Sequence, residues 1–285
     1  MSRPGLGLLT PIVTLTPGGH AKWESDGTIE DLARIAEAAD ALGYDHVTCS
    51  EHVAVPADAV AVRGSRYWDP LATFGYLAAR TTRLRFTTNV LVLGYHHPLD
   101  IAKRYGTLDR VTGGRLVLGL GVGSLEEEFT LLGAPFADRG ARGDDALRAL
   151  RASFSVASPA YDGPFYRYSG MVVDPVGVQA HVPMWIGGRT PRSLRRAVDL
   201  GDGWCPFGLS PAAVASMLAA VDLPDRFEVV IQNQRPIDPL GSPDDTVATV
   251  AALVGCGATM LSLRFVHHSL EHYLDQLARL VDLLG

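Results

Sequence analysis

The sequence predicts an α/β fold, a (β/α)8 or TIM barrel, with an insertion at about residues 153–182. Eight short apolar segments alternate with eight segments of helical periodicity along the 285 residues. Such alternation implies a parallel sheet, and eight is the number of strands that closes into this barrel. Chains of this length often form one such barrel, so we expect residues 1–285 to be a single domain.

Helix start and stop signals define the first half of the chain. Thr28 begins the first helix with Asp31 completing a capping box, and Gly43 ends it. Asp69 followed by Pro70 is an N-cap with proline at the first helical position. Strands are expected at 5–9, 45–50, 83–93 and 116–121, and helices at 28–43, 69–80, 98–112 and 138–152.

The rhythm breaks between residues 153 and 182, where glycine and proline recur with tyrosine and phenylalanine between them. This pattern predicts an excursion with a hairpin, which is either a lid over a site or a passive surface loop. Regular alternation then resumes. Strands are expected at 184–187, 204–207, 227–232 and 260–265, and helices are expected to begin at Thr190, Ser210, Ser242 and Leu270.

Composition excludes several classes of function. A net charge of -6 and the lack of a Lys/Arg block argue against a nucleic-acid partner. No stretch reaches ~18 apolar residues and no secretion signal begins the chain, so we expect no membrane partner and a cytoplasmic protein. The three cysteines are scattered and no histidine pair has metal-ligand spacing, so we expect reduced thiols and no metal site.

The chemistry of this architecture lies at the carboxyl ends of the strands. Glycines, amides, carboxylates, arginines and one histidine occur there, which together favour a large, partly anionic ligand. The strand-end residues are Thr10, Glu51, His52, Asn89, Gly121, Gly123, Ser124, Glu126, Gly187, Gly188, Arg189, Phe207, Asn233 and Arg264.

Two glycine-rich strand ends are candidates for phosphate. In IGGRTPRS, Gly187 and Gly188 leave a strand, and Arg189 and Thr190 lead into a helix whose free N–H groups would bind an anion. Ordinary turn and capping chemistry is the alternative. GLGVGS, residues 119–124, is expected beside it; its spacing and its position late in the chain do not fit a dinucleotide fingerprint.

His52 is the histidine best placed for acid–base work, because an unperturbed imidazole titrates near neutrality. A capping or packing role is the equal alternative. Among Glu126, Glu127 and Glu128, we select Glu126 as a second candidate because it is nearest the strand end; a solvated helix start is the alternative for all three.

Three segments carry a resemblance to a known family. They are YDHVTCSEH, PMWIGGRTPRSLRRAVDLGDGW, and HPLDIAKRYGTLDRVTGGRLVLGLGVGSLEEEFTLLGAPFADRGARGDDALRAL. Together they resemble the bacterial luciferase-like superfamily of flavin- and F420-dependent oxidoreductases. The resemblance implies a barrel that binds coenzyme F420 or FMN at its carboxyl end, and a homodimer. Leu125 stands where many members carry a tryptophan, which leaves the substrate open.

The resemblance also implies roles for individual residues. Gly187, Gly188, Arg189 and Thr190 would hold the phosphate, with Gly121, Gly123 and Ser124 nearby. A non-proline cis peptide between Asn89 and Val90 would support the central ring of the cofactor. Glu51 would contact the cofactor, and His52 or Glu126 would deliver a proton.

The compact chain and the LEEEF loop, which looks actinobacterial, resemble the F420-dependent branch. The function implied is hydride transfer between deazaflavin C5 and a small organic substrate. The alternatives are an FMN-dependent monooxygenase and a non-catalytic flavin-binding barrel. An aldolase or isomerase would normally need a strand-end lysine, and neither Lys22 nor Lys103 is placed at one.

Overall fold

The computed structural model describes residues 4–285 and contains the predicted closed barrel of eight parallel strands. Each strand pairs with its neighbours in ring order, and the pairing of β3 with β5 closes the ring. The two-residue β4 continues the third strand beyond a short interruption and also pairs with β5. The barrel strands are β1 (Gly5–Leu8), β2 (His46–Cys49), β3 (Arg85–Thr88) with β4 (Leu91–Val92), β5 (Leu116–Gly121), β8 (Met184–Gly187), β9 (Gly203–Cys205), β10 (Glu228–Gln232) and β11 (Met260–Leu263).

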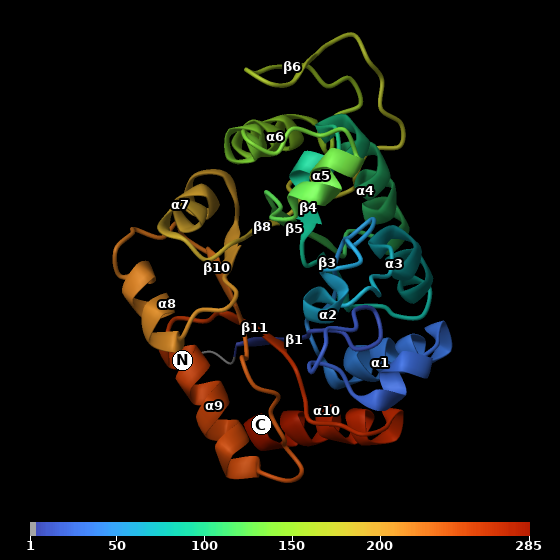
Figure 1. Ribbon diagram of the computed structural model, residues 1–285, viewed down its shortest axis with the longest axis vertical. Coiled ribbons are helices and arrows are strands. Elements are labelled where there is room, and N and C mark those ends of the chain that lie inside the picture. The colour runs from blue at the N-terminus through green and yellow to red at the C-terminus, as the bar shows by residue number, and fades with distance from the viewer. Residues whose placement is uncertain (1–3) are drawn as a thin grey trace.

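Helices surround the ring of strands, as Figure 1 shows. They occupy the predicted positions, each after its strand: α1 (Ile29–Leu42), α3 (Pro70–Ala78), α4 (Pro98–Thr112), α6 (Arg139–Ser153), α7 (Pro191–Leu200), α8 (Pro211–Leu218), α9 (Pro243–Gly255) and α10 (Leu270–Leu284). The capping box of Thr28 and Asp31 and the N-cap of Asp69 are present as expected. The left-handed φ of 79° at Gly43 ends α1.

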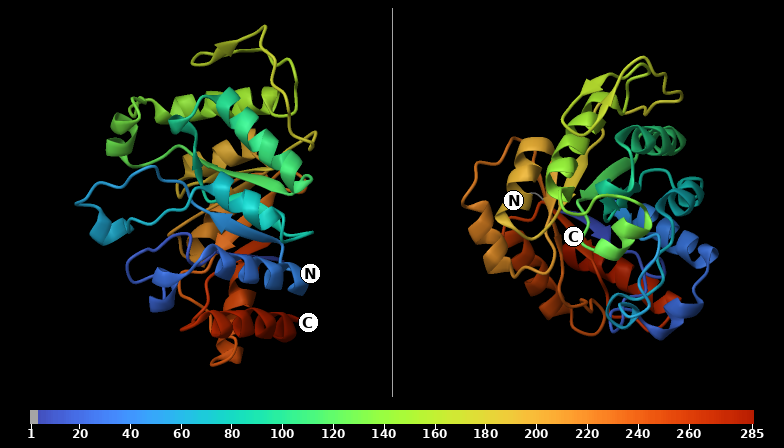
Figure 2. Two further views of the ribbon diagram at one scale, coloured as in Figure 1. Left: turned by 90° about the vertical axis from the view of Figure 1, so that its right-hand side faces the viewer. Right: turned by 45° about the horizontal axis from the view of Figure 1, so that its top comes forward.

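Four short helices lie in the connecting segments, and of these only the last was considered from the sequence, as the helix start that is the alternative for the three acids 126–128. They are η1 (Lys22–Asp26), α2 (Val60–Arg63), η2 (Leu93–Tyr95) and α5 (Glu126–Leu131). Each is six residues or fewer, too short for a periodic pattern. The left view of Figure 2 shows the light-blue segment near residue 60 and the green segment near residue 130 on the side opposite both chain ends. These segments therefore build up the carboxyl end of the barrel.

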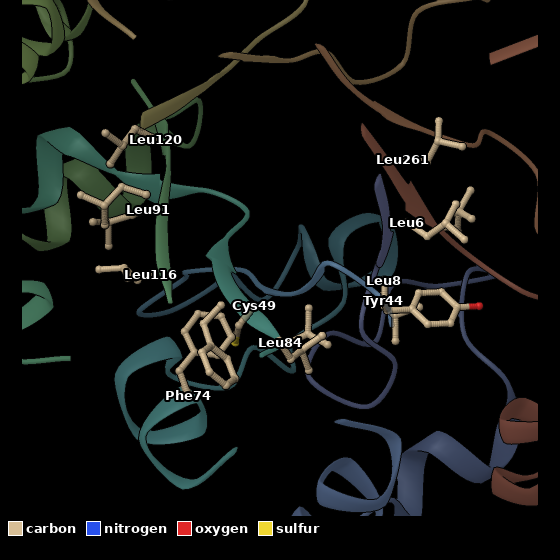
Figure 3. Packing of buried hydrophobic residues seen from close by; sticks show 14 of the residues in the cluster. Leu6, Leu8, Tyr44, Cys49, Phe74, Leu84, Leu91, Leu116, Leu120 and Leu261 are labelled. Carbon is tan, nitrogen blue, oxygen red and sulfur yellow. The ribbon is translucent and has the colours of Figure 1, made fainter. Parts of the chain in front are cut away.

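Packing explains the alternating sequence of β1, GLGL. A side chain on Gly7 would meet the His46 ring at 2.1 Å, and one on Gly5 would meet the Met260 sulfur at 2.4 Å. The two glycines therefore make room for large side chains from neighbouring strands. The leucines join the large apolar cluster that includes helix residues, and Figure 3 shows Leu6 beside Leu261 within it. A strand with this pattern is fixed in register because a shift by one residue would exchange the two faces.

The insertion contains the predicted hairpin, formed by β6 (Tyr161–Asp162) and β7 (Arg167–Tyr168) in antiparallel pairing. It projects beyond α6 in Figure 1. Buried Asp145 of α6 holds it, accepting hydrogen bonds from the Tyr161 hydroxyl at 2.6 Å and the Phe165 backbone N–H at 2.9 Å.

Within residues 4–285, no helix is long and apolar enough to cross a membrane.

Candidate active site

A cleft of about 380 Å³ lies at the carboxyl ends of the strands. Residues from all parts of the chain line it, so only the closed barrel assembles it. Eleven of the residues predicted from the sequence line the cleft: Glu51, His52, Asn89, Val90, Gly121, Gly123, Ser124, Gly187, Gly188, Phe207 and Arg264. The strand-end rule therefore located the cleft correctly.

His52 and Glu128 form the main polar pair of the cleft. Nδ1 of His52 lies 2.7 Å from Oε2 of Glu128, and the His52 ring packs edge-on against Tyr67. The Glu128 side chain is fully buried, whereas that of His52 is 18% exposed. No hydrogen bond to Nε2 of His52 occurs within residues 4–285. The imidazole is thus fixed at one nitrogen and free at the other.

Four donors surround the Glu128 carboxylate. Besides His52, they are the Tyr95 hydroxyl at 2.6 Å and the backbone N–H groups of Val53 at 2.5 Å and Ala54 at 3.3 Å. Burial alone would raise the pKa of Glu128, but the hydrogen bonds from Tyr95, His52 and Val53 outweigh it and lower that pKa. Glu128 is therefore an anion at neutral pH. An anionic carboxylate only accepts, so Nδ1 of His52 carries the hydrogen.

The structure does not bring Glu126 to the cleft. Its side chain is exposed in the first turn of α5, and it is absent from the lining. Glu128, two residues further on, is buried instead. The reason is the start of α5: a helix turns by about 100° per residue, so residues 126 and 128 point to different sides. Distance from the strand end was therefore the wrong criterion for choosing Glu126 among the three acids.

Glu51 lines the cleft but is already committed to protein partners. Its carboxylate accepts from the Val92 backbone N–H at 2.8 Å and contacts Nε2 of His96 at 2.6 Å. Burial lowers the pKa of His96, but the hydrogen bond to Glu51 more than offsets this, so the pKa is raised. Glu51 thereby fixes the segment after strand β3 in place.

The peptide bond between Asn89 and Val90 is cis, as expected. Ser50 donates to the Asn89 carbonyl at 2.8 Å, and Gln232 donates to the Asn89 side-chain oxygen at 3.3 Å. Val90 and Asn89 both line the cleft. This interruption is also where the third strand divides into β3 and β4.

Close approach of neighbouring protein groups accounts for the glycines in and directly after β5. A Cβ on Gly121 would lie 2.6 Å from a Val90 methyl group, and one on Gly123 would lie 2.6 Å from the Phe129 ring. A Cβ on Gly119 would meet the Thr88 carbonyl oxygen at 1.8 Å. Close approach of other protein groups therefore requires these glycines, whatever ligand the cleft takes.

The predicted phosphate loop is only partly at the cleft. Gly187 and Gly188 line it, whereas Arg189 and Thr190 are exposed and absent from the lining. Thr190 caps α7: its hydroxyl accepts from the Ser193 N–H at 3.2 Å, and its own N–H donates to the Ser193 hydroxyl at 3.1 Å. The capping alternative therefore explains Thr190. The N–H group of Arg192 has no side-chain cap within the described residues.

Several lining residues escaped the sequence reasoning. Most lie in connecting loops or at positions where no local signal distinguishes them: Thr14, Thr16, Ser50, Tyr67, Tyr95, Val92, Val122, Cys205 and Gln232. Ser50 directly follows β2, and Gln232 is the last residue of β10. The strand-end rule could therefore have included both. Tyr67 and Tyr95 follow strands only at a distance along the chain, and no pattern marks them.

Comparisons with known proteins agree with this geometry. The family model described as luciferase-like monooxygenase matches residues 10–231. An uncharacterized protein of Mycobacterium tuberculosis is 31% identical over 199 residues, covering 66% of this chain and 68% of that protein. A protein of the same organism named "Putative coenzyme F420-dependent oxidoreductase" is 29% identical over 194 residues, covering 64% of this chain and 52% of that protein.

Solved structures share the fold over nearly the whole chain. A monooxygenase from Streptomyces bottropensis has a TM-score of 0.79 at 22% identity, covering 98% of both chains. An F420-dependent secondary alcohol dehydrogenase in complex with an F420–acetone adduct has a TM-score of 0.78 at 14% identity, covering 100% of both chains. A type II Baeyer–Villiger monooxygenase of Pseudomonas putida in complex with FMN has a TM-score of 0.72 at 14% identity, covering 99% of this chain and 98% of that chain. At these identities the likeness shows the fold alone.

Proposed function

Because this chain belongs to the luciferase-like monooxygenase family, we propose that it is an F420-dependent oxidoreductase transferring a hydride between deazaflavin C5 and a small organic substrate. The observation that carries the proposal is the His52–Glu128 pair at the cleft. A hydride that adds to a carbonyl or an activated double bond must be matched by a proton, and the pair supplies a residue that can deliver or remove one.

The pair is arranged for proton transfer at Nε2 of His52. The Glu128 anion holds the hydrogen of Nδ1, and the edge contact with Tyr67 limits rotation of the ring. Nε2 accepts a proton to form an imidazolium, whose charge the buried carboxylate stabilises, or returns it to the substrate. Glu128 acts as a positioning residue because it reaches the reacting atoms only through His52. Tyr95 is also a positioning residue, because it lines the cleft wall beside His52 and donates a hydrogen bond to Glu128.

The cleft fits a flavin or deazaflavin. A cavity of about 380 Å³ is within the range of ligand sites, and Gly187 and Gly188 expose backbone at the strand end expected to face the phosphate. The bound cofactor would supply the hydride chemistry. The protein would supply binding, orientation and exclusion of water, with Asn89 and Val90 beneath the ring and the β8 end near the phosphate.

The choice of F420 over FMN is supported by an arginine rim, which we define as Arg139, Arg142, Arg189 and Arg192 at the starts of α6 and α7. None of the four forms an ion pair within residues 4–285, whereas nearby Arg196 pairs with Asp144. Arg139 does donate hydrogen bonds to the Gly123 and Phe136 carbonyls, each at 3.2 Å. Nε of Arg142 is buried without a partner. F420 extends beyond its phosphate in a tail of carboxylates, for which unpaired arginines are suitable partners. A relative whose printed name includes F420 dependence points in the same direction.

An FMN-dependent monooxygenase is the second candidate function. The family description and the structure determined with FMN favour it. A non-catalytic flavin-binding barrel is the third. The second and third candidates would use the same cleft and the same phosphate position as the main proposal. They differ from it in which cofactor is bound and in whether turnover requires His52.

Titrating the purified chain separately with FMN and with oxidised and reduced F420, followed by absorbance and fluorescence, tests the proposal. We expect F420 to bind more tightly than FMN, and Arg192→Gln to weaken F420 binding more than FMN binding. Arg34→Gln, on a remote exposed ion pair with Glu271, is the matched control. Binding of neither cofactor overturns the redox proposal, and tight binding of FMN alone favours the second candidate.

We also propose that the chain functions as one domain and as a homodimer. The family resemblance supports the dimer. Light scattering of the purified chain across a dilution series tests it, and a monomeric mass at all concentrations would contradict it.

A further inference from the structure

A second, smaller cavity of about 100 Å³ opens off the cleft. We call it the inner chamber. It shares lining residues with the cleft at the ends of β2, β3, β10 and β11, among them Ser50, Asn89, Gln232 and Arg264. A cavity of this size holds a few waters or a small functional group, not a ring system.

Two hydroxyl groups of the inner chamber are buried without a hydrogen-bond partner. They are Oγ1 of Thr14 and the phenolic oxygen of Tyr273. Tyr273 is 1% exposed. A buried hydroxyl without a partner is destabilising, so both groups are expected to be satisfied by something that enters the chamber.

Arg264 lies between the chamber and the cleft. It is half-buried and lines both cavities. Its backbone N–H donates to Asn233 at 2.8 Å, but its guanidinium group forms no hydrogen bond or ion pair within residues 4–285. A guanidinium stays charged in proteins and presents a planar set of donors that matches a carboxylate.

Among residues 4–285, Glu24 is the one carboxylate that lines the chamber, and the positive charge of Arg264 acts on it. Glu24 accepts from the Ile12 N–H at 2.9 Å and from the Ala21 N–H at 2.7 Å, and Nε2 of His267 lies 3.5 Å from it. Trp23 can only donate, so its hydrogen bond of 2.9 Å to Nδ1 of His267 leaves the ring hydrogen on Nε2. Glu24 is thus held by the backbone, and the groups left open in the chamber are mainly donors.

We propose that the inner chamber binds a carboxylate group of the substrate, with Arg264 as the charged donor and Thr14 and Tyr273 as hydroxyl donors. The substrate class is then a small organic acid whose reducible or oxidisable carbon lies in the cleft. The identification as a substrate site rests on the proposed function.

The order of strands around the barrel supports placing the cofactor in the cleft and the substrate carboxylate in the inner chamber. In ring order, three pairings separate β11, which Arg264 follows, from β8, which ends at Gly187. A cofactor with its phosphate at Gly187 and Gly188 is therefore anchored at a different part of the barrel rim from Arg264. His52 lines the cleft between these two parts, where it can serve a carbon next to the group held in the chamber.

Acetate and its neutral analogue acetamide are the probes for this site. We expect ligand-observed NMR of the full chain to show acetate binding about tenfold more tightly than acetamide, because charge-assisted hydrogen bonds are the stronger ones. Arg264→Gln should remove the preference, and Tyr273→Phe and Thr14→Val should each weaken acetate binding several-fold. Arg34→Gln, which removes a remote surface charge, should leave it unchanged.

The measurement separates the inference from the proposed function. Equal binding of acetate and acetamide, or an acetate affinity that survives both Arg264→Gln and Tyr273→Phe, overturns the inference. A loss of F420 affinity in Tyr273→Phe with no acetate preference in the parent chain would assign the chamber to the cofactor and also overturn it. Acetate binding in a chain that binds neither F420 nor FMN would overturn the proposed function alone. Circular dichroism of each variant confirms that it is folded.

Discussion

The imidazole of His52 is joined to the carboxylate of Glu128 across 76 residues of sequence, with 2.7 Å between Nδ1 and Oε2. His52 follows β2, whereas Glu128 belongs to α5 after β5. The contact therefore ties two connecting loops together over the cleft. Because the carboxylate is buried and ionised, it decides which imidazole nitrogen faces the ligand.

Glu128→Gln tests the role of this carboxylate. An amide can donate to Nδ1 and so favour the other tautomer, which places the hydrogen on Nε2. We expect kcat to fall by up to roughly 10⁴-fold, as for a catalytic histidine whose orienting carboxylate is replaced by an amide, with a smaller change in cofactor affinity. Steady-state kinetics with the identified cofactor measure this. Glu127→Gln, an exposed neighbour in the same turn, is the control, and equal kinetics for the two variants would contradict the role.

His52→Gln removes proton transfer while keeping a polar side chain. We expect kcat to fall by roughly 10²–10⁴-fold, the usual contribution of general acid–base catalysis, and the pH dependence of kcat to flatten. Cofactor affinity, followed by fluorescence titration, should change little. Unchanged turnover would remove His52 from the mechanism and favour the non-catalytic alternative.

Gly121→Ala tests the packing of Val90 beneath the cleft. The added Cβ would lie 2.6 Å from a Val90 methyl group, so Val90 must move. We expect a stability loss of about 1–3 kcal/mol in chemical denaturation, together with weaker cofactor binding. Gly75→Ala in α3 is the matched control: its Cβ meets nothing within 4 Å, and the chain should gain about 0.5–1 kcal/mol. Full stability and affinity in Gly121→Ala would show that Val90 is free to adjust.

His267 should give the protein a pH-dependent stability. Burial lowers its pKa from 6.5 to about 4, so the folded state binds fewer protons than the unfolded state between these values. The contribution of His267 is therefore fully present above pH 6.5 and is lost as the pH falls towards 4, by about 3 kcal/mol at most. Denaturation at several pH values measures the slope, and His267→Asn should reduce it. An NMR titration of the ring with a midpoint near 6.5 would refute the expectation.

The eight-fold alternation could be recognised from the sequence because each signal is local. These signals act within a few residues and do not depend on the tertiary context. Examples are Thr28 with Asp31, Asp69 with Pro70, and the glycine that ends α1. The hairpin of the insertion was recognisable for the same reason. The short helices η1, α2 and η2 were not, because each has five residues or fewer and is too short to show a periodic pattern.

By itself, the sequence determined the barrel, its insertion, and the set of strand ends that converge on the cleft. The closed ring of strands converts position along the chain into position in space, which is why His52, Asn89 and Gly187 could be assigned to one site. Only the tertiary structure decided which groups in that region are free and which are occupied. Glu128 rather than Glu126 meets His52, Thr190 caps a helix, and the Arg264 guanidinium has no hydrogen bond or ion pair within residues 4–285. Hydrogen bonding and burial depend on partners far apart in the chain, and no local pattern encodes those partners.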